Sequence, residues 1–472
     1  MEINKNNNYL PSNKLIFICG ILVFLISFIY LCINNDYLII FDAKYYVTLS
    51  KSFVDSDGFS LYNYPETFRG VIFPLLLCIF NKMVVFFSTD IIFGWRLLVS
   101  LLVTLATVQL PLIFKDLIKK RLNVLEIFIP LLLLHFFWYG LINNPLSDIV
   151  SLCFFIFGLS FLRISIFRKF SFIMAIVSGL SFYIAYNTRT IYIFPIFFVI
   201  VGTLFYSIYY KKIKLNRFLF ILLGLIIGIL MIGMVQLIIN INCYDKYTIS
   251  VIANYNNGNL FMYQINNGIW ISQYETYFSK NYNDYPKPGI MFVDPIGQEI
   301  VSKDTSLLEY IKHPIELCGI YIRHFLNMLN PVWGGGAYIT DIHSLKIHRS
   351  IINYTILFVV FKYLIKKLNG ISFENVKSSF KNNYITILSI ISLLICFAAI
   401  LPGAVESRFA LPFYLIIYGL FAYCIPLKEV WLDVKTQPIK NAIIYISIFT
   451  LLCCYWTYTY HTTGEDIPLS IW

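Results

Sequence analysis

Apolar segments long enough to cross a membrane recur along the whole chain, and they limit the folds open to it. A run of about 20 apolar residues spans the hydrocarbon core as a helix. We expect about eleven spans, near residues 14–34, 90–114, 124–142, 149–167, 171–188, 190–209, 217–240, 350–365, 384–402, 409–426 and 440–459. Hydrophobic residues make up 58% of the 472 residues, which is more than a soluble domain can bury. The sequence therefore predicts an all-α integral membrane protein.

Lysine and arginine residues gather in every second loop of this eleven-helix pattern. Their clusters lie at 115–121, 168–169, 211–217, 362–381 and 428–440. Such clusters mark cytoplasmic loops, so we expect the remaining loops to face outward. An apolar stretch at 71–87 would break the alternation as a twelfth span. We therefore expect it to lie in the membrane interface or to re-enter.

The net charge of +11 follows from these topology signals. Basic residues are not interleaved with aromatic residues in any soluble region, so we expect membrane lipid as a partner and no nucleic acid.

The expected loops divide the chain into three parts. Residues 1–240 form an N-terminal membrane module whose first outer loop is 35–89, residues 241–349 form a large extracytoplasmic loop, and residues 350–472 form C-terminal membrane helices. Within the large loop, 307–329 has the pattern of an amphipathic helix that lies on a membrane. Cys243 and Cys318 flank the loop and could pair in an oxidising compartment.

The expected outer ends of the apolar segments carry acids together with arginines. These charged residues are Asp42, Lys44, Arg69, Asp148, Arg189, Glu406 and Arg408. Ionised groups beside lipid are costly and are therefore functional candidates, and guanidinium groups bind phosphate through two parallel hydrogen bonds. The set favours a phosphate-bearing lipid substrate. Alternatively, the acids only end or cap helices and the arginines anchor helices at the interface.

Short motifs around these residues follow one another in a recognisable order. They are Asp42-Ala43-Lys44-Tyr45-Tyr46, Phe68-Arg69-Gly70-Val71-Ile72-Phe73-Pro74, Gly94-Trp95-Arg96, Pro145-Leu146-Ser147-Asp148, Ala185-Tyr186-Asn187-Thr188-Arg189-Thr190 and Glu406-Ser407-Arg408-Phe409. This series resembles the GT-C superfamily of polytopic glycosyltransferases, in particular the bacterial relatives of protein mannosyltransferases and aminoarabinose transferases. Many members carry two adjacent acids in the first motif, whereas Ala43 follows Asp42 here.

The resemblance implies an inverting glycosyltransferase that moves a sugar from a polyprenyl-phosphate donor to a glycan, lipid or protein acceptor. The active site would face outward from a bacterial inner or plasma membrane and contribute to a cell envelope glycan. Asp42 is then the catalytic residue, and the substrate-binding candidates are Lys44, Tyr45, Arg69, Asp148, Arg189, Glu406 and Arg408. No cofactor is assigned, and a divalent metal remains open.

The same residues suit this chemistry without the resemblance. A phosphate leaves as a weakly basic anion, so one aspartate acting as general base suffices, whereas glycoside hydrolysis uses two carboxylates. Arginines stabilise the charge that develops on the phosphate. Three alternatives remain: a polysaccharide polymerase or ligase that depends on its large loop, a flippase for lipid-linked oligosaccharide with charges deep in its helices, and an inactive scaffold.

Overall fold

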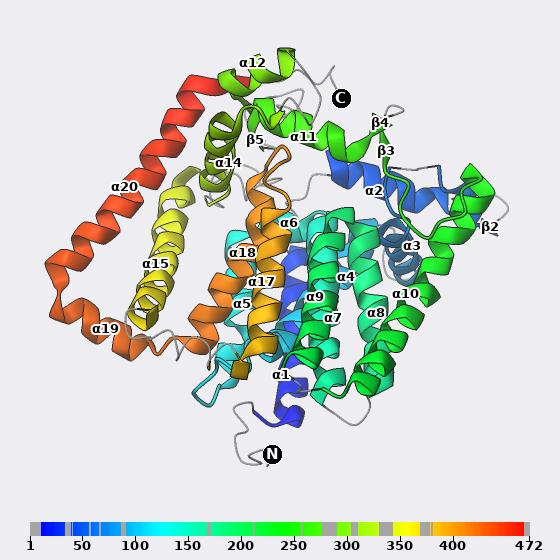
Figure 1. Ribbon diagram of the computed structural model, residues 1–472, viewed down its shortest axis with the longest axis horizontal. Helices are drawn as coiled ribbons and strands as arrows, with labels where there is room; N and C mark the ends of the chain where they lie inside the picture. Colours follow the sequence, from blue (N-terminus) through cyan, green and yellow to red (C-terminus); the bar gives the residue numbers. More distant parts are fainter. Residues whose placement is uncertain are drawn as a thin grey trace.

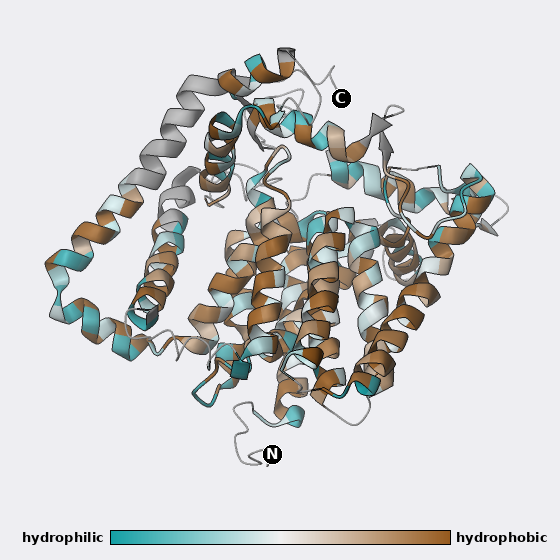
Figure 2. Cartoon of the chain, viewed as in Figure 1, coloured by the Kyte–Doolittle hydropathy of each residue, from teal (hydrophilic) through white to brown (hydrophobic). Residues whose placement is uncertain are grey.

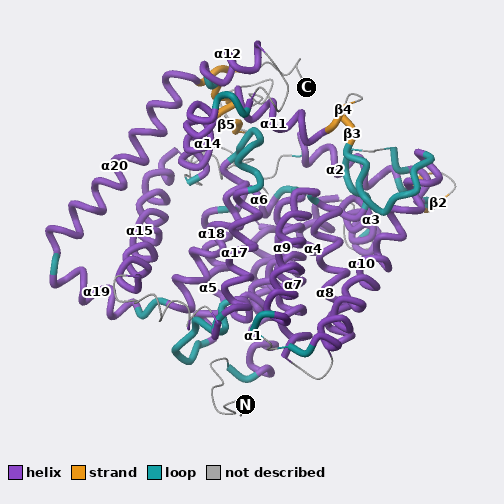
Figure 3. Tube along the Cα trace, in the orientation of Figure 1, coloured by secondary structure: helices purple, strands orange, loops and turns teal. Residues whose placement is uncertain are grey.

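The protein folds as a bundle of apolar helices with a layer of shorter elements across one end, as the computed structural model shows (Figure 1). The structure describes residues 11–33, 39, 41–55, 58–65, 68–85, 91–167, 171–210, 213–255, 258–275, 290–303, 310–329, 343–368, 378 and 381–466. Strands in this part of the chain form three small antiparallel sheets toward the same end of the bundle (Figure 3). They pair β1 (Val54–Asp55) with β2 (Gly58–Phe59), β3 (Asn254–Tyr255) with β4 (Gly258–Asn259), and β6 (Ile290–Val293) with both β5 (Ile271–Glu275) and β7 (Gly464–Asp466). The layer at that end is called the end layer below.

Seven helical segments in the described ranges are long and apolar enough to cross a membrane. They are α1 (Asn13–Ile33), α4 (Ile91–Ile113), α7 (Ser147–Phe167), α8 (Ser171–Thr188), η2 with α9 (Thr190–Tyr192 and Ile193–Ile208), α10 (Leu215–Tyr244), and η3, α18 and η4 (Ser407–Ala410, Leu411–Gly419 and Leu420–Cys424). Large apolar side chains such as Phe197 and Met231 are exposed on them, and the helices of the bundle consist mostly of hydrophobic residues (Figure 2). Lipid can cover such a surface, which confirms a helical membrane protein.

Four of the eleven expected spans are helical but do not belong to these seven. The expected span at 124–142 is divided into α5 (Val124–Phe137) and α6 (Tyr139–Asn143), because Trp138 between them leaves the helical conformation. Near 384–402, α17 (Tyr384–Ala398) has 15 residues. The other two of these four, expected at 350–365 and 440–459, fall within α15 (His343–Leu368) and α20 (Pro438–Thr463). Eleven spans therefore remain a prediction.

The stretch at 71–87 forms α3 (Ile72–Val84), which at 13 residues is too short to span a bilayer. Figure 1 shows α3 nearly end-on, whereas α7, α8 and α9 run along the bundle. One face of α3 buries Phe73 and Leu77, and Met83 is exposed. Its direction and length suit the helix that we expect in the membrane interface.

The end layer is built largely from the long loop, with β1 and β2 from the first loop and a strand near residue 465. Its main elements are α11 (Leu260–Trp270), β5 (Ile271–Glu275), β6 (Ile290–Val293), α12 (Pro295–Lys303), α14 (Pro314–Met328) and β7 (Gly464–Asp466). α14 lies within the predicted amphipathic helix 307–329 and buries Ile320 while it exposes Ile315. The pairing of β7 with β6 was not predicted. Cys243 and Cys318 are both free thiols.

His324 of α14 joins the end layer to the bundle. The ring is fully buried, its Nδ1 lies 2.6 Å from the carbonyl oxygen of Leu401, and its Nε2 lies 3.1 Å from that of Ile271. The contact with Leu401 fixes the turn that precedes η3. The end layer is therefore held against the residues that begin η3.

α8 and α10 approach so closely that only glycine fits at their contact. A Cβ atom on Gly179 would overlap the backbone of Leu225, and one on Gly228 would overlap the backbone of Ile176. Small residues of this kind let membrane helices pack backbone against backbone.

We expect Gly228→Ala to lower the stability of the protein by about 1–3 kcal/mol, because the new methyl group forces the two helices apart. Gly233→Ala in the same helix is the matched control, since its Cβ would lie 3.4 Å from the nearest atoms of Tyr183, an ordinary contact. The thermal unfolding midpoints of the two variants in detergent measure the difference. Equal midpoints would contradict the close packing of α8 on α10.

Candidate functional site

Six of the charged residues singled out in the sequence lie together at the end of the bundle that the end layer covers. They are Asp42, Arg69, Asp148, Arg189, Glu406 and Arg408, and they are called the charged cluster below. Each lies where a helix begins: in the first turns of α2 (Phe41–Ser52) and α7, before α3, before η2, and at the start of η3. α14 packs against η3. Charged groups gather there because the lipid-covered flanks of the bundle cannot solvate them.

Asp42 lies between two arginines. Its Oδ1 accepts a hydrogen bond from Nη2 of Arg69 at 2.7 Å, and its Oδ2 accepts one from Nη2 of Arg408 at 2.9 Å. The side chain of Asp42 is 31% exposed, and that of Arg69 is 25% exposed. Asp42 therefore does more than mark the end of the first helix, because it binds Arg408, which lies 366 positions away in the chain.

Arg408 forms the deep side of the charged cluster. Besides Asp42 it contacts Oε1 of Glu406 at 2.6 Å and Oδ2 of Asp148 at 3.6 Å. Asp148 also pairs with Nη1 of Arg189. Arg408 and Asp148 are nearly buried, each with a side chain 6% exposed. The cluster contains three carboxylates and three guanidiniums, so its formal charges balance and the cost of burying each charge is offset by its partners.

The pKa of Asp42 reflects two opposing effects. Burial is the largest single influence and disfavours the carboxylate, but the positive charges of Arg69 and Arg408 outweigh it and hold the pKa well below the usual range. Asp42 is therefore a carboxylate at neutral pH. It is also a weak base for as long as both arginines remain on it.

The tyrosines of the first motif differ in their contacts with Arg69. Nη1 of Arg69 donates a hydrogen bond to the hydroxyl oxygen of Tyr46 at 2.9 Å, and its guanidinium lies 5.1 Å from the centre of that ring. Tyr45, the predicted substrate-binding residue, lies 5.7 Å from the same guanidinium. Lys44 is exposed and takes part in none of the ion pairs found among the described residues. Tyr46, on the inward side of α2, is the tyrosine that positions Arg69.

Phe409 supports the other two arginines. Its ring centre lies 4.6 Å from the guanidinium carbon of Arg189 and 5.2 Å from that of Arg408. A cavity of about 10 Å³ borders Asp148, Arg189, Arg408 and Phe409, which is room for about one water molecule. A larger ligand can therefore enter this part of the cluster only if its ion pairs open.

Two buried amides that the sequence analysis did not single out hold the backbone after Arg69. Asn187 Oδ1 accepts a hydrogen bond from the backbone N–H of Ile72 at 2.8 Å, and Gln236 Oε1 accepts one from that of Val71 at 3.2 Å. The amide of Asn187 also donates to Gln236 at 2.8 Å. A polar residue within an apolar run, such as Gln236, is the signal that could have revealed this contact.

Gly70 and Tyr64 fix the same segment from its other side. A Cβ atom on Gly70 would overlap the backbone oxygen of Asn187, so this close approach requires glycine. The hydroxyl of Tyr64 lies 3.1 Å from the carbonyl oxygens of both Arg69 and Gly70. The guanidinium of Arg69 is thus held at Asp42 by its backbone as well as by its side chain.

The cluster suits an anionic ligand better than a metal ion. Among the described residues no group of three or more His, Cys, Asp or Glu side chains is placed to hold a metal, and the carboxylates of the cluster already accept from arginines. Guanidiniums can exchange a carboxylate for a phosphate, which offers the same fork of acceptor oxygens. The arrangement can therefore bind a phosphate and, once it does, free a carboxylate beside it.

Comparison with known proteins does not place the chain in a family. The sequence matches no protein-family model and no curated protein. The resemblance to GT-C glycosyltransferases stays a prediction from the short sequence motifs.

Proposed function

We propose that this protein is an inverting glycosyltransferase that moves a sugar from a polyprenyl-phosphate donor to an acceptor glycan, lipid or protein. The observation that carries the proposal is the position of Asp42, a partly exposed carboxylate held by Arg69 and Arg408 at one end of a membrane-spanning bundle. A lipid-linked donor can reach such a site from the bilayer. Its phosphate can bind to the guanidiniums. Transfer of its sugar requires one general base, which takes the proton from the acceptor hydroxyl.

In the proposed reaction, the acceptor hydroxyl oxygen attacks the anomeric carbon of the donor sugar from the face opposite the phosphate. The bond from that carbon to the phosphate oxygen breaks, and the hydroxyl proton passes to a carboxylate oxygen of Asp42. Polyprenyl phosphate leaves as an anion whose charge the guanidiniums stabilise. Attack on the opposite face inverts the anomeric configuration.

Binding of the donor phosphate prepares Asp42 for this role. The phosphate takes Arg69 and Arg408 from Asp42, and the carboxylate becomes more basic as it loses them. Arg69 has a further donor, because its buried Nε has no hydrogen-bond partner among the described residues. Glu406, at 2.6 Å, keeps Arg408 in place during the exchange.

Three other residues complete the proposed site. Asp148 positions Arg189 by its ion pair. Lys44 and Tyr45 lie on α2 with Asp42 and would contact the substrate at the more exposed edge of the site.

We further propose that the site faces outward from the inner or plasma membrane of a bacterium. Two observations support this orientation. The basic clusters at 115–121 and 211–217 mark other loops as cytoplasmic, and the end layer, built largely from the long loop, covers the end with the charged cluster. The protein would then act on a cell envelope glycan.

Mass spectrometry of lipid-linked and surface glycans tests the proposal. The strains are wild type, a deletion, and the deletion complemented with an Asp42→Asn variant whose presence in the membrane is verified. We expect both mutant strains to lack one defined sugar. If the variant behaves as wild type while the deletion shortens or strands whole glycans, a polymerase, ligase or flippase takes the place of the transferase.

The pH dependence of the rate gives a separate prediction. Although burial opposes ionisation, Arg69 and Arg408 hold the pKa of the Asp42 carboxyl below its usual range. In the protein without bound donor, Asp42 therefore becomes protonated only below about pH 4. The value of kcat/KM should stay constant between pH 7 and about pH 5.

Donor phosphate raises the pKa of Asp42 by engaging its arginines, so the acid limb of kcat should lie at higher pH than that of kcat/KM. Initial rates at low and at saturating donor, measured from pH 7 to below about pH 4, give the acid limbs of kcat/KM and of kcat. Limbs that coincide would show that the phosphate does not take the arginines.

A further inference from the structure

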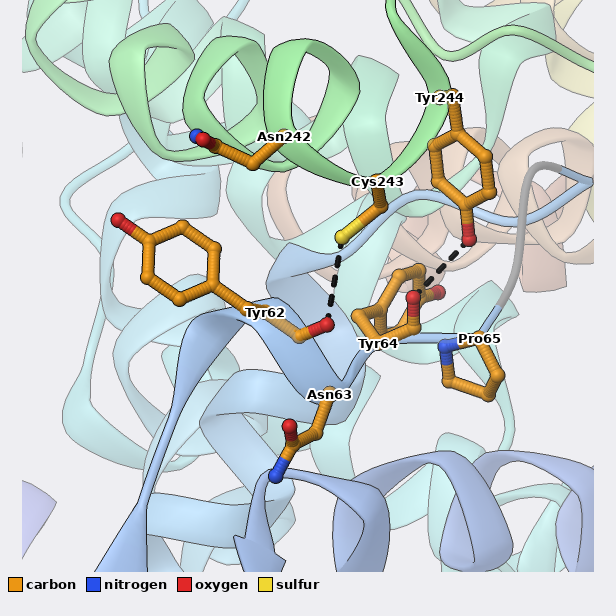
Figure 4. A pocket seen from close by; sticks show the side chains of 7 residues that line it. All are labelled: Tyr62, Asn63, Tyr64, Pro65, Asn242, Cys243 and Tyr244. Atoms are coloured by element: carbon orange, nitrogen blue, oxygen red, sulfur yellow. Dashed lines mark hydrogen bonds between the residues drawn. The ribbon is translucent and has the colours of Figure 1, made fainter.

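A groove lies beside the charged cluster, where the first loop meets the end of α10. It has a volume of about 560 Å³, within the range of small-molecule binding sites. One wall is the segment around η1 (Leu61–Asn63), and the other is the last turn of α10. Cys243 Sγ donates to the carbonyl oxygen of Tyr62 at 3.3 Å, and the Tyr244 hydroxyl donates to that of Tyr64 at 3.0 Å (Figure 4). These contacts join segments about 180 residues apart into one site.

Among the described residues, the side chains that line the groove are those of three tyrosines, two asparagines, a proline and a cysteine, and none of them is charged. They include Tyr62, Asn63, Asn242 and Tyr244. Tyr62 is 59% exposed, and Figure 4 shows its ring on the same side of the groove as the Asn242 side chain. Tyrosine provides a flat apolar face with a polar tip, and an asparagine amide can both donate and accept hydrogen bonds.

This chemistry matches a neutral saccharide. A sugar ring has C–H groups on its faces, which pack on an aromatic ring, and hydroxyl groups around its edge, which bond to amides. A phosphorylated ligand would require cations, and a lipid tail would require a continuous apolar wall. The described lining residues provide neither.

The groove is also connected to the proposed catalytic residues. Tyr64, whose backbone oxygen receives the Tyr244 hydroxyl, places its own hydroxyl 3.1 Å from the backbone oxygen of Arg69. The guanidinium of Arg69 in turn contacts Asp42 at 2.7 Å. The groove therefore lies on the segment that leads to Arg69, which brings a saccharide bound there to the same end of the bundle as Asp42.

We propose that this groove binds a neutral saccharide and that, on the basis of the proposed function, this saccharide is part of the acceptor. The acceptor of the transferase is then a glycan rather than a protein or a simple lipid. Binding in the groove does not require Asp42, so the two proposals can fail separately.

Saturation-transfer NMR tests the binding, with full-length protein in nanodiscs of neutral phospholipid. The probes are neutral hexasaccharides of glucose, of mannose and of N-acetylglucosamine. We expect at least one to bind wild type, Tyr62→Ala to weaken that binding at least about ten-fold, and Asp42→Asn to leave it unchanged. Tyr247→Ala is the matched control, because Tyr247 is 81% exposed but does not line the groove.

The transfer reaction then separates the outcomes. Tyr62→Ala should raise the KM for the acceptor at least about five-fold with little change in kcat. If none of the hexasaccharides binds in a Tyr62-dependent way and the KM is unchanged, the groove proposal is overturned. If Tyr62→Ala instead weakens binding of an anionic phospholipid, the groove is a lipid site and the proposal is also overturned. If the wild-type protein binds a saccharide but transfers no sugar, the proposed function is wrong, and the groove remains a saccharide-binding site.

Discussion

We expect replacement of Asp42 by asparagine to lower the rate of the proposed sugar transfer about 10³-fold, within the range that a general base contributes. Asparagine keeps the shape of the side chain and can still accept one hydrogen bond, but it cannot take the acceptor proton. The initial rate with a polyprenyl-phosphate sugar, measured on purified protein, gives the size of the loss. Asp42→Glu keeps the carboxylate and misplaces it, so its rate should lie between those of wild type and Asp42→Asn.

Asp433→Asn is the matched control for this loss. Asp433 is also an ion-paired aspartate, with Oδ2 at 2.6 Å from Nζ of Lys362, but it belongs to α19 (Leu427–Thr436) at the opposite end of the bundle (Figure 1). Its replacement should leave the rate unchanged. If the Asp42→Asn protein keeps more than a tenth of the wild-type rate, Asp42 is not the general base.

Replacing Arg408 by glutamine should destabilise the folded protein by roughly 3–5 kcal/mol, the cost of breaking a buried ion pair from one side. Arg408 contacts Asp42, Glu406 and Asp148. Its removal leaves nearby carboxylates that repel one another where water cannot fully solvate them. Sugar transfer should be lost as well, because the phosphate loses a guanidinium.

Thermal unfolding in detergent measures this effect, with Lys120→Gln as the control. Lys120 pairs with Glu126, and their side chains are 36% and 21% exposed, so its loss should lower the midpoint much less. Arg408→Lys keeps the charge without the planar fork and should fold better than Arg408→Gln while still losing transfer. If Arg408→Gln unfolds at the wild-type midpoint, the charged cluster does not stabilise the protein.

Much of the candidate site could be predicted because its members obey a local rule. Arg189 and Glu406 each stand at the end of an apolar run, and a charged group at that place is visible from its immediate neighbours. The roles of the two tyrosines are not local in this way. Tyr45 and Tyr46 are adjacent in the same motif, and only the packing of α2 determines that Tyr46 faces Arg69.

The parts of the fold that were missed depend on contacts between distant segments. Gln236 meets the backbone of Val71 across 165 residues, and β7 pairs with β6 far earlier in the chain. Hydropathy along the sequence has no information on either contact. The hydropathy pattern also predicted one continuous helix at 124–142, whereas the bend at Trp138 divides this apolar run into α5 and α6.

The sequence by itself determined the class of this protein and the places where its charges lie. Both follow from the cost of moving polar groups into lipid, which each segment meets on its own. The tertiary structure alone decided which charges become partners. Asp42 and Arg408 meet only when α2 and η3 are brought to the same end of the bundle. Their pairing there offsets the cost of removing three carboxylates and three guanidiniums wholly or partly from water.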